Sequence, residues 1–465
     1  MRLALLLSIL PAASAVLSAA ALQAKLNAAI ASRSPTFTVP AGEYNFSGIG
    51  NFNISHAGDL RVVAAGAKLW FGGTRTKHAY LNHGVNITNS RGLHISGLSI
   101  NYTNPPHGRE GVPGISYNLL NCTDVVSEDI TVFSAPFFSV TAFNGGGGHV
   151  FRRFHLPNTT YKPRGPDAYA HQRDAFHFTD LRRGVTLEDS DGSSFGDDFF
   201  NSHNTIMIVL KQESPTTLLL INPHVQNVAS GRNTVYGTNC VLQDLRGGDE
   251  LSFFAAQNVS LFAPVRKLGG NSALPSVVSA APRLAADAGT LAEAAALAKV
   301  MQAEFSDALT KMISFDASDV WRVRFRAAVP PSAVASSLVN IDSFSTPGTV
   351  VRNNSFVNTR YNIGRFKSSG GAIVNNSFAK AGVQNLEITP LMQYFEGPLP
   401  FVRDVEISGN VFSDGNRSGY EHPVHCSPFC GGKCPPFSCS RCANCAAPGN
   451  AWTVNISVHS NTIVP

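Results

Sequence analysis

The repeat that decides the fold reads Asn354-Ser-Phe, Asn376-Ser-Phe, Asn410-Val-Phe and Asn461-Thr-Ile, with intervals of 22, 34 and 51 residues. An interval near 22 with one short apolar strand per copy matches one coil of a parallel β-helix, in which each coil pairs with the coils before and after it. The longer intervals fit a coil that carries an inserted loop. An Asn at the same place in every copy predicts a ladder of stacked amide side chains at a turn.

The first half of the chain carries the same pattern. Segments 85–100 and 119–132 resemble one another, and Gly184-Val-Thr-Leu-Glu-Asp-Ser190 is a third copy. A β-propeller or a β-sandwich would require periods near 40 or hairpins with two-residue Asn-Gly turns, which are nearly absent. We therefore expect an all-β protein built as a right-handed parallel β-helix.

Two segments depart from this pattern. Leu22, Leu26 and Ile30 recur every four residues, which predicts a short amphipathic helix over 20–33 that caps the open end of the sheet. The alternating strands 251–255 and 320–325 flank an Ala-rich segment, 291–305, that has helix-forming composition. We expect four parts: a signal peptide at 1–15, β-helix coils at 20–244, an inserted β-rich subdomain with a helical excursion at 245–346, and further coils at 347–465.

The N-terminus has the layout of a secretory signal. Met1 and Arg2 precede the apolar stretch 3–10, and Ala13-Ser-Ala15 offers a cleavage site. An uncleaved membrane anchor is the alternative, because apolar residues continue to Leu22. We expect a secreted protein without membrane contact after signal removal.

Asn-x-Ser/Thr sequons agree with export of a glycoprotein, although Asn, Ser and Thr also populate β turns. The eleven sequons begin at Asn45, Asn53, Asn86, Asn101, Asn121, Asn158, Asn258, Asn353, Asn375, Asn416 and Asn455.

Six of the eight cysteines lie between Cys426 and Cys445, among Pro and Gly residues. In an exported chain this spacing predicts a disulfide-stapled loop whose connectivity stays open. A zinc knuckle is the competing interpretation, with Cys439, Cys442, Cys445 and His425 as its ligands. Cys122 and Cys240 remain as buried thiols or as a long-range bridge.

Composition excludes several classes of function. The 465 residues are 43% hydrophobic and 14% charged, which is too apolar for a disordered chain. The net charge is +5, but no basic run concentrates it, so nucleic acid is not an implied partner. The oligomeric state is left open.

The richest cluster of acidic residues contains Asp174, Asp197 and Asp198. Asp174 and Asp197 lie 23 residues apart, which is one coil, so they are expected on neighbouring coils at a backbone spacing of about 4.8 Å. Gly196 offers the bend that would let Asp197 and Asp198 share one site. Three crowded carboxyls repel, so at least one retains its proton, and glycoside hydrolysis requires such a division between acid and base.

Three other interpretations compete with catalysis. Asp residues line exposed turns of β-helices, clustered carboxylates bind Ca²⁺ as in the calcium-dependent lyases of this architecture, and a β-helix can be an inert adhesion rod. A non-catalytic, glycan-binding rod predicts that the three carboxylates do not converge.

The motifs Asp174-x-x-His177-Phe178 and Gly196-Asp-Asp-x-x-Asn201-x-His203 resemble those of glycoside hydrolase family 110, the inverting exo-acting α-1,3-galactosidases. More distantly, they are similar to the Gly-Asp-Asp motif of the family 28 polygalacturonases. The resemblance covers about residues 36–415 and implies a β-helix of the pectin-lyase-like superfamily that acts on an oligo- or polysaccharide.

The resemblance also implies roles for individual residues. Asp197 would be the general acid, Asp174 and Asp198 would position and deprotonate the attacking water, and no metal or other cofactor would be needed. The implied outcome is inversion at a terminal α-linked galactose or a related sugar. The side chains expected to bind the sugar are His177, Asn201, His203, Arg360, Lys367 and Glu396.

One departure from the galactosidase pattern suggests a second activity. The basic residues near Arg360 are displaced, and Arg365-x-Lys367 is similar to the Arg-x-Lys pair that binds uronate in polygalacturonases. It lies far later after Gly-Asp-Asp than that family would place it, so we expect coincidence. With the positive net charge, it still leaves open a polygalacturonase-like hydrolase or a lyase of acidic polysaccharide.

Overall fold

The structure of the chain is a computed structural model. It describes residues 18–47, 50–72, 84–102, 115–158, 169–227, 232–233, 245–255, 268, 275–282, 288–304, 313–314, 320–382, 386–388, 397, 402–413, 424–425 and 453–464. The predicted signal peptide, the cysteine cluster 426–445, Cys240, Asn258 and Asn416 lie outside these residues. Cys122, the one cysteine among the described residues, is buried.

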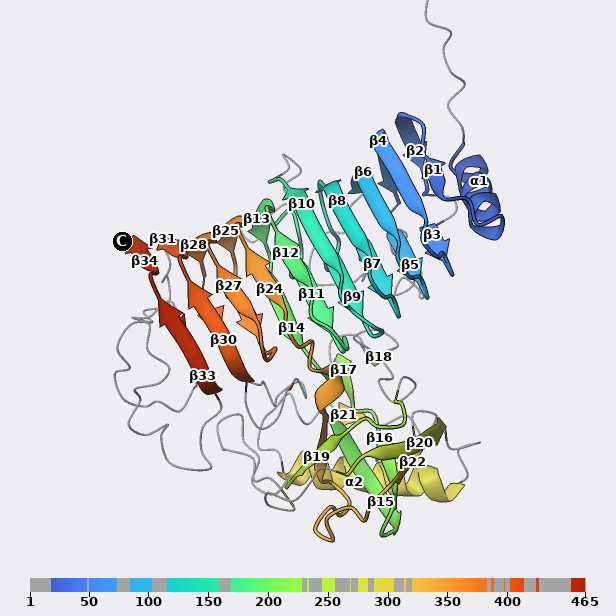
Figure 1. The fold of residues 1–465 in the computed structure, drawn as a ribbon, viewed down its shortest axis with the longest axis vertical. Helices are drawn as coiled ribbons and strands as arrows, with labels where there is room; N and C mark the ends of the chain where they lie inside the picture. Colours follow the sequence, from blue (N-terminus) through green and yellow to red (C-terminus); the bar gives the residue numbers. More distant parts are fainter. Residues whose placement is uncertain are drawn as a thin grey trace, which may run out of the picture.

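The chain folds as a right-handed parallel β-helix, as the repeat predicts (Figure 1). Its larger sheet contains β1 (Thr36–Thr38), β2 (Gly42–Asn45), β4 (Arg61–Phe71), β6 (His94–Tyr102), β8 (Val126–Val132), β10 (Val150–Leu156), β12 (Thr186–Glu188), β13 (Asp191–Phe195), β24 (Val350–Arg352), β25 (Ser355–Thr359), β27 (Ala372–Val374), β28 (Ser377–Ala381), β30 (Val402–Ser408), β31 (Val411–Ser413), β33 (Thr453–His459) and β34 (Thr462–Val464). Neighbouring strands in this sheet are parallel, so each coil extends the sheet by its own strands.

A second parallel sheet, which we call the short-strand sheet, faces the first. Its strands follow in the order β3 (Phe52–Ser55), β5 (Val85–Thr88), β7 (Tyr117–Leu120), β9 (Val140–Phe143), β11 (Phe176–Thr179), β14 (Phe200–His203), β26 (Gly364–Phe366), β29 (Leu386–Glu387) and β32 (Val424–His425). The order jumps from β14 to β26, so a long stretch of chain leaves the stack between two adjacent coils.

The predicted amide ladder is present. Asn354 Nδ2 donates to Asn376 Oδ1 at 3.0 Å, Asn376 Nδ2 donates to Asn410 Oδ1 at 2.9 Å, and Asn410 Nδ2 donates to Asn461 Oδ1 at 2.9 Å. The same amides also donate to main-chain carbonyls, as Asn376 does to Val351 O at 3.0 Å. The repeat is therefore maintained by buried hydrogen bonds, because an unpaired amide in this position would be costly.

Between the sheets runs a continuous apolar core that contains a column of stacked phenylalanines. Ring centroids lie 5.3 Å apart for Phe199 and Phe356, and 5.7 Å apart for Phe378 and Phe412. Burial of each such ring stabilises the fold by about 1.5–3 kcal/mol, so the column adds rigidity to the coils on which the acidic cluster lies.

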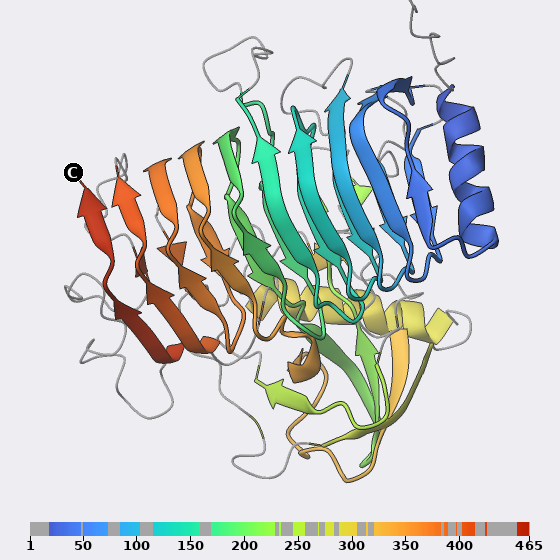
Figure 2. The same cartoon turned by 45° about the horizontal axis from the view of Figure 1, so that its top comes forward.

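The predicted capping helix is α1 (Ala19–Ala31), at the N-terminal end of the stack (Figure 2). The Ser18 side chain accepts a hydrogen bond from Ala21 N–H at 3.2 Å, which is the usual N-cap arrangement. Leu22 and Leu26 are buried against the core, so the helix covers the open end of the β-helix.

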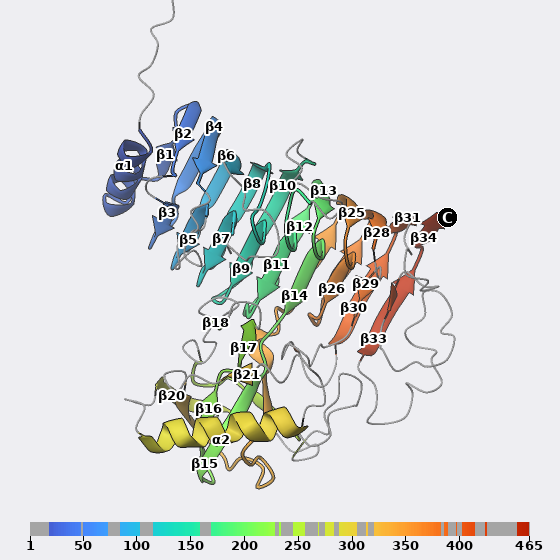
Figure 3. The same cartoon turned by 180° about the vertical axis from the view of Figure 1, so that it is seen from behind.

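The chain between β14 and β24 forms an inserted subdomain beside the stack (Figure 3). Its main sheet is antiparallel, in the order β19 (Leu251–Phe254), β23 (Leu338–Ile341), β15 (Met207–Ser214), β16 (Thr217–Ile221), β22 (Val320–Phe325) and β20 (Val277–Pro282). Smaller elements are α2 (Ala288–Glu304), the 3-10 turn η5 (Asp342–Phe344), and a separate sheet of β17 (His224–Asn227), β18 (Arg232–Asn233) and β21 (Ile313–Ser314).

The observed start of this subdomain differs from the expected boundary at residue 245. β15 and β16 belong to its antiparallel sheet, so the departure from the stack begins directly after β14. The apolar alternation of 207–221 is the same in an antiparallel hairpin and in a β-helix coil, and sequence periodicity does not separate the two. Among the described residues, no helix is long and apolar enough to cross a membrane.

Candidate active site

The acidic cluster forms where two neighbouring coils bend into the short-strand sheet. Asp174 lies just before β11 and Asp198 just before β14, and Ala175 N–H donates to Asp198 O at 3.0 Å. A Cβ at Gly196 would lie 2.4 Å from Gln172 O, so only glycine lets the two coils approach this closely. This bend lets the side chains of the consecutive residues Asp197 and Asp198 reach the same site.

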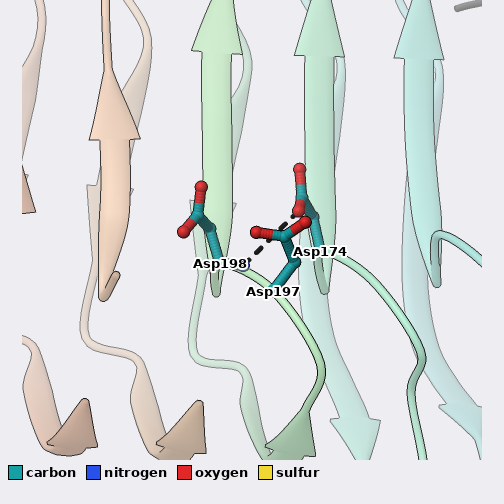
Figure 4. Close-up of side chains that lie close together, drawn as sticks. All are labelled: Asp174, Asp197 and Asp198. Atoms are coloured by element: carbon teal, nitrogen blue, oxygen red, sulfur yellow. Dashed lines mark hydrogen bonds between the residues drawn. The ribbon is translucent and has the colours of Figure 1, made fainter. Parts of the chain in front are cut away.

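The three carboxylates converge (Figure 4), but the partner of Asp174 on the next coil is Asp198 and not the predicted Asp197, because β11 and β14 pair with an offset of 24 residues. One oxygen from each of Asp174, Asp197 and Asp198 lies within 4.8 Å of the other two. A point at the centre of such a triangle is no more than about 2.8 Å from each oxygen, which is a hydrogen-bond distance. A single water molecule can therefore contact all three carboxyl groups. The glycan-binding rod hypothesis predicted no such convergence.

Burial separates the roles of the three acids. Asp174 and Asp198 are 3% and 1% exposed, whereas the Asp197 side chain is 17% exposed. Burial, with a further contribution from the carboxylates of Asp197 and Asp174, holds the pKa of Asp198 well above its usual range, although the charge of Arg365 lowers it. Burial and the charge of Asp174 also raise the pKa of Asp197, against the lowering effect of Arg173. The cluster therefore retains a proton at a pH where isolated carboxyls have lost theirs.

Two arginines flank the cluster. Arg173 Nη1 donates to Asp197 Oδ2 at 2.9 Å, and the Asp197 main-chain carbonyl accepts from the Thr359 hydroxyl. Arg365 Nε lies 3.4 Å from Asp198 Oδ2 and donates to Glu387 Oε2 at 3.1 Å. Asp198 Oδ1 accepts from Asn362 N–H at 3.0 Å, while its buried Oδ2 accepts no hydrogen bond from the described residues. That oxygen is available to a water molecule or a substrate.

His177 and His203, expected to bind sugar, lie beside the acids but are buried. His177 Nδ1 is 2.6 Å from Asp174 Oδ2, and His177 Nε2 is 3.1 Å from His203 Nε2. Asn201 of β14 pairs with His177 of β11 on one side and with Arg365 of β26 on the other. Its buried Oδ1 has no hydrogen-bond partner among the described residues.

The remaining expected sugar ligands are distributed differently. Lys367 follows β26 directly and is fully buried, and its N–H donates to Ser202 O at 2.8 Å. Arg360 is exposed, with its guanidinium 5.2 Å from the Tyr361 ring centroid, and no described contact ties it to the aspartates. Glu396 lies outside the described residues.

Arg365 lies in the site, although its distance along the chain from Gly196-Asp-Asp predicts that its likeness to the polygalacturonase pair is a coincidence. β26 pairs directly with β14, and Asn201 lies opposite Arg365. The inserted subdomain accounts for the whole separation. The repeat indicates this placement, because the first coil after the insert must pair with β14 wherever the insert ends.

The three aspartates are also the only group of described side chains that could hold a metal ion. Ca²⁺ prefers six to eight oxygen ligands, and the adjacent Arg173 and Arg365 already supply positive charge to Asp197 and Asp198. A metal-free site remains our prediction.

No family model matches the sequence, and no curated protein matches it. Among solved structures, the chain is similar to the mannuronan C-5 epimerase AlgE4 A-module of Azotobacter vinelandii, with 8% identity, a TM-score of 0.32, and coverage of 96% of this chain and 93% of that chain. It is similar to an endo-xylogalacturonan hydrolase from Aspergillus tubingensis, with 8% identity, a TM-score of 0.38, and coverage of 95% and 89%. It is also similar to the catalytic domain of a GH87 α-1,3-glucanase in complex with nigerose, with 10% identity, a TM-score of 0.29, and coverage of 97% and 68%. These values assign no activity to the chain.

Proposed function

We propose that this protein is a glycoside hydrolase that uses Asp174, Asp197 and Asp198 without a metal ion. The observation that carries the proposal is the convergence of three carboxyl groups from two neighbouring coils within 4.8 Å. Hydrolysis of a glycosidic bond requires one protonated and one ionised carboxyl group at the same place, and mutual repulsion in a buried cluster produces that mixture.

Asp197 is assigned as the general acid. It is the most exposed of the three side chains, so its carboxyl group can reach a leaving-group oxygen, and its raised pKa favours the protonated form. In the proposed step, Asp197 gives its proton to the glycosidic oxygen as the bond from that oxygen to the anomeric carbon breaks.

Asp174 and Asp198 are assigned to the attacking water. Asp174 Oδ1 and Asp198 Oδ2 belong to neighbouring coils, and Asp198 N–H contacts Asp174 Oδ1 at 3.4 Å. A water between them would lose its proton to Asp174 as its oxygen bonds to the anomeric carbon, while Asp198, whose raised pKa favours the protonated form, would orient the water. The proton gained by Asp174 balances the proton released by Asp197.

We propose inversion of the anomeric configuration, as the family resemblance implies. The oxygen separation of at most 4.8 Å is shorter than the roughly 6.5–9.5 Å that is common between acid and base in inverting enzymes. The separation rule alone would favour retention, whereas a single water that contacts all three carboxyls favours direct attack by water. The anomer of the first product separates the two routes.

A terminal α-linked galactose or a related sugar is the proposed substrate, on the strength of the resemblance carried by Asp174, Gly196 and His203. The position of Arg365 favours a second candidate, the hydrolysis of an acidic polysaccharide. Its guanidinium is 3.4 Å from Asp198 Oδ2, so a cationic side chain adjoins the reacting groups. A sugar carboxylate would find complementary charge there.

The experiment is a hydrolysis screen with α-galactosides, β-galactosides and pectic fragments, in which NMR reads the anomer formed first. Release of a sugar from α-galactosides with inversion is the expected result. Products from pectic fragments alone would favour the second candidate, and unsaturated, ultraviolet-absorbing ends would indicate a lyase. The absence of hydrolysis of every glycan would contradict the proposal.

A further inference from the structure

Two buried histidines connect Asp174 to the end of β14. Asp174 Oδ2 is 2.6 Å from His177 Nδ1, and His177 Nε2 is 3.1 Å from His203 Nε2. His203 Nδ1 is 3.2 Å from the main-chain oxygen of Asn204. His177 and His203 are 2% and 5% exposed, so this chain of hydrogen bonds is shielded from solvent.

The direction of these hydrogen bonds follows from the Asn204 carbonyl. A carbonyl oxygen only accepts, so His203 carries its proton on Nδ1, and the Nε2 of the neutral ring accepts. His177 must then donate from Nε2, which leaves one proton shared between its Nδ1 and Asp174 Oδ2. The Thr179 hydroxyl, 3.3 Å from His203 Nε2, can donate to the same acceptor.

We infer that His177 and His203 are positioning residues for Asp174 and not ligands of sugar hydroxyls, an inference that rests on the proposed hydrolysis. With Oδ2 held by His177, the other oxygen of Asp174 is directed at Asp198 N–H, 3.4 Å away, on the side where the attacking water would bind. His203 acts on Asp174 indirectly, because its contact with His177 fixes which nitrogen of His177 carries the hydrogen.

The surroundings of His177 leave no polar edge of its ring to a sugar. Both ring nitrogens face the partners named above, and the rings of Phe138 and Phe143 pack against it with centroid distances of 4.6 and 5.7 Å. The buried carboxyl of Asp180 is the other titratable group near this ring, and it is held by Thr205 N–H at 2.6 Å and the Thr205 hydroxyl at 2.7 Å. A role in orientation, and not in binding, fits this packing.

The activity test uses two variants at His203. His203→Leu removes the acceptor for His177, and we expect kcat to fall by as much as roughly a hundredfold while KM changes little, because misplacement of a reacting group affects the transition state more than substrate binding. His203→Gln offers an amide oxygen near the position of Nε2, and it should restore most of kcat. His149→Asn is the matched control. His149 is a buried histidine directly before β10 and lies outside the site, so this substitution should leave kcat and KM unchanged.

A raised KM with unchanged kcat in His203→Leu would instead show sugar binding and overturn the inference, and unchanged values of both constants would overturn it too. Nitrogen-15 NMR of the histidine rings in the full chain tests the arrangement independently of any activity. We expect His203 protonated on Nδ1 and His177 protonated on Nε2. A His203 ring protonated on Nε2 alone would contradict the inference even if the protein hydrolyses glycans, and the expected protonation would support it even if no glycan is hydrolysed.

Discussion

Asn201 and Arg365 lie opposite one another in adjacent parallel strands, β14 and β26, although the inserted subdomain separates them in sequence. This pairing brings a guanidinium to within 3.4 Å of Asp198 Oδ2, at the centre of the acidic cluster. The insert therefore interrupts the sequence of the candidate site without interrupting its geometry.

Arg365→Gln tests which sugar the site accepts. If a sugar carboxylate pairs with Arg365, KM for pectic fragments should rise by about tenfold or more, because the loss of a charge-assisted hydrogen bond costs about 1.5–3 kcal/mol. Hydrolysis of neutral α-galactosides should change less. Equal losses on both substrates in steady-state kinetics would show that Arg365 acts on the aspartates and not on the sugar.

The raised pKa of Asp198 predicts a pH-dependent difference in stability. A carboxyl group whose pKa is higher in the folded state favours folding below its ordinary pKa and loses that contribution as the pH rises through the raised value. Asp198→Asn should therefore gain stability relative to the parent as the pH rises from about 4 through the raised pKa, by about 1.4 kcal/mol per unit of pKa shift. Chemical denaturation of both proteins across this range measures the difference. A constant difference would contradict the prediction.

The same electrostatics predicts the alkaline limb of the activity. Asp197 must be protonated to act as the general acid, and burial with the neighbouring charge of Asp174 raises its pKa. We expect kcat/KM to fall as the pH rises through that raised pKa. Arg173→Gln removes a charge that lowers this pKa, so it should move the limb to higher pH. A shift in the opposite direction would rule out Asp197 as the acid.

The inserted subdomain is attached to the catalytic coil by Arg182, which donates to both oxygens of Asp249 at 2.7 and 2.8 Å. Its guanidinium also lies 4.2 Å from the Phe344 ring centroid. Asp249→Asn leaves the mostly buried Arg182 charge without its carboxylate, and we expect a loss of about 3–5 kcal/mol. Hydrogen exchange should show the loss in the insert before the coils.

The adjacent Arg183 provides the control for that experiment. Its pair with Asp124 is largely exposed, and Arg183→Ala should cost no more than about 1 kcal/mol. Equal effects of the two substitutions would mean that the insert is not held by the Arg182–Asp249 pair.

The amide ladder predicts a graded effect of Asn to Ala substitution. Asn376→Ala removes partners from Asn354, Asn410 and two carbonyls, and should destabilise the fold by about 3 kcal/mol. Asn461→Ala, at the end of the ladder, should cost less, since it has a ladder partner on one side only among the described residues. Thermal unfolding compares the two, and equal losses would contradict a cooperative ladder.

Features set by coil length could be predicted from the sequence. The spacing of Asn354 and Asn376 equals one coil, and a periodic fold converts such spacing directly into contact. The spacing of Asp174 and Asp197 misses the coil offset by one residue, so the clustering was predicted but the stacked partner, Asp198, was not. The start of the insert could not be predicted, because apolar alternation in 207–221 fits both a coil and a hairpin. The position of Arg365 depended on that boundary.

The roles of the histidines required coordinates for a different reason. His177 and His203 follow the acids at short intervals, which suggested sugar binding, but the sequence does not show which ring atoms meet. The 2.6 Å contact of His177 with Asp174 is local, between residues three apart, whereas the 3.1 Å contact of His177 with His203 arises from the register between β11 and β14. Register depends on bends such as that at Gly196, which the sequence indicates without fixing their angle.

The central claim is that the three-aspartate cluster hydrolyses a glycosidic bond, and Asp197→Asn tests it most directly. The variant keeps the shape of the side chain but cannot donate the acid proton, so the rate of sugar release from the best substrate should fall by about 10²–10⁴-fold, with the fold intact by circular dichroism. Asp189→Asn is the matched control. Asp189 is exposed in the turn between β12 and β13, so this variant should retain full activity. Undiminished hydrolysis by Asp197→Asn would contradict the account.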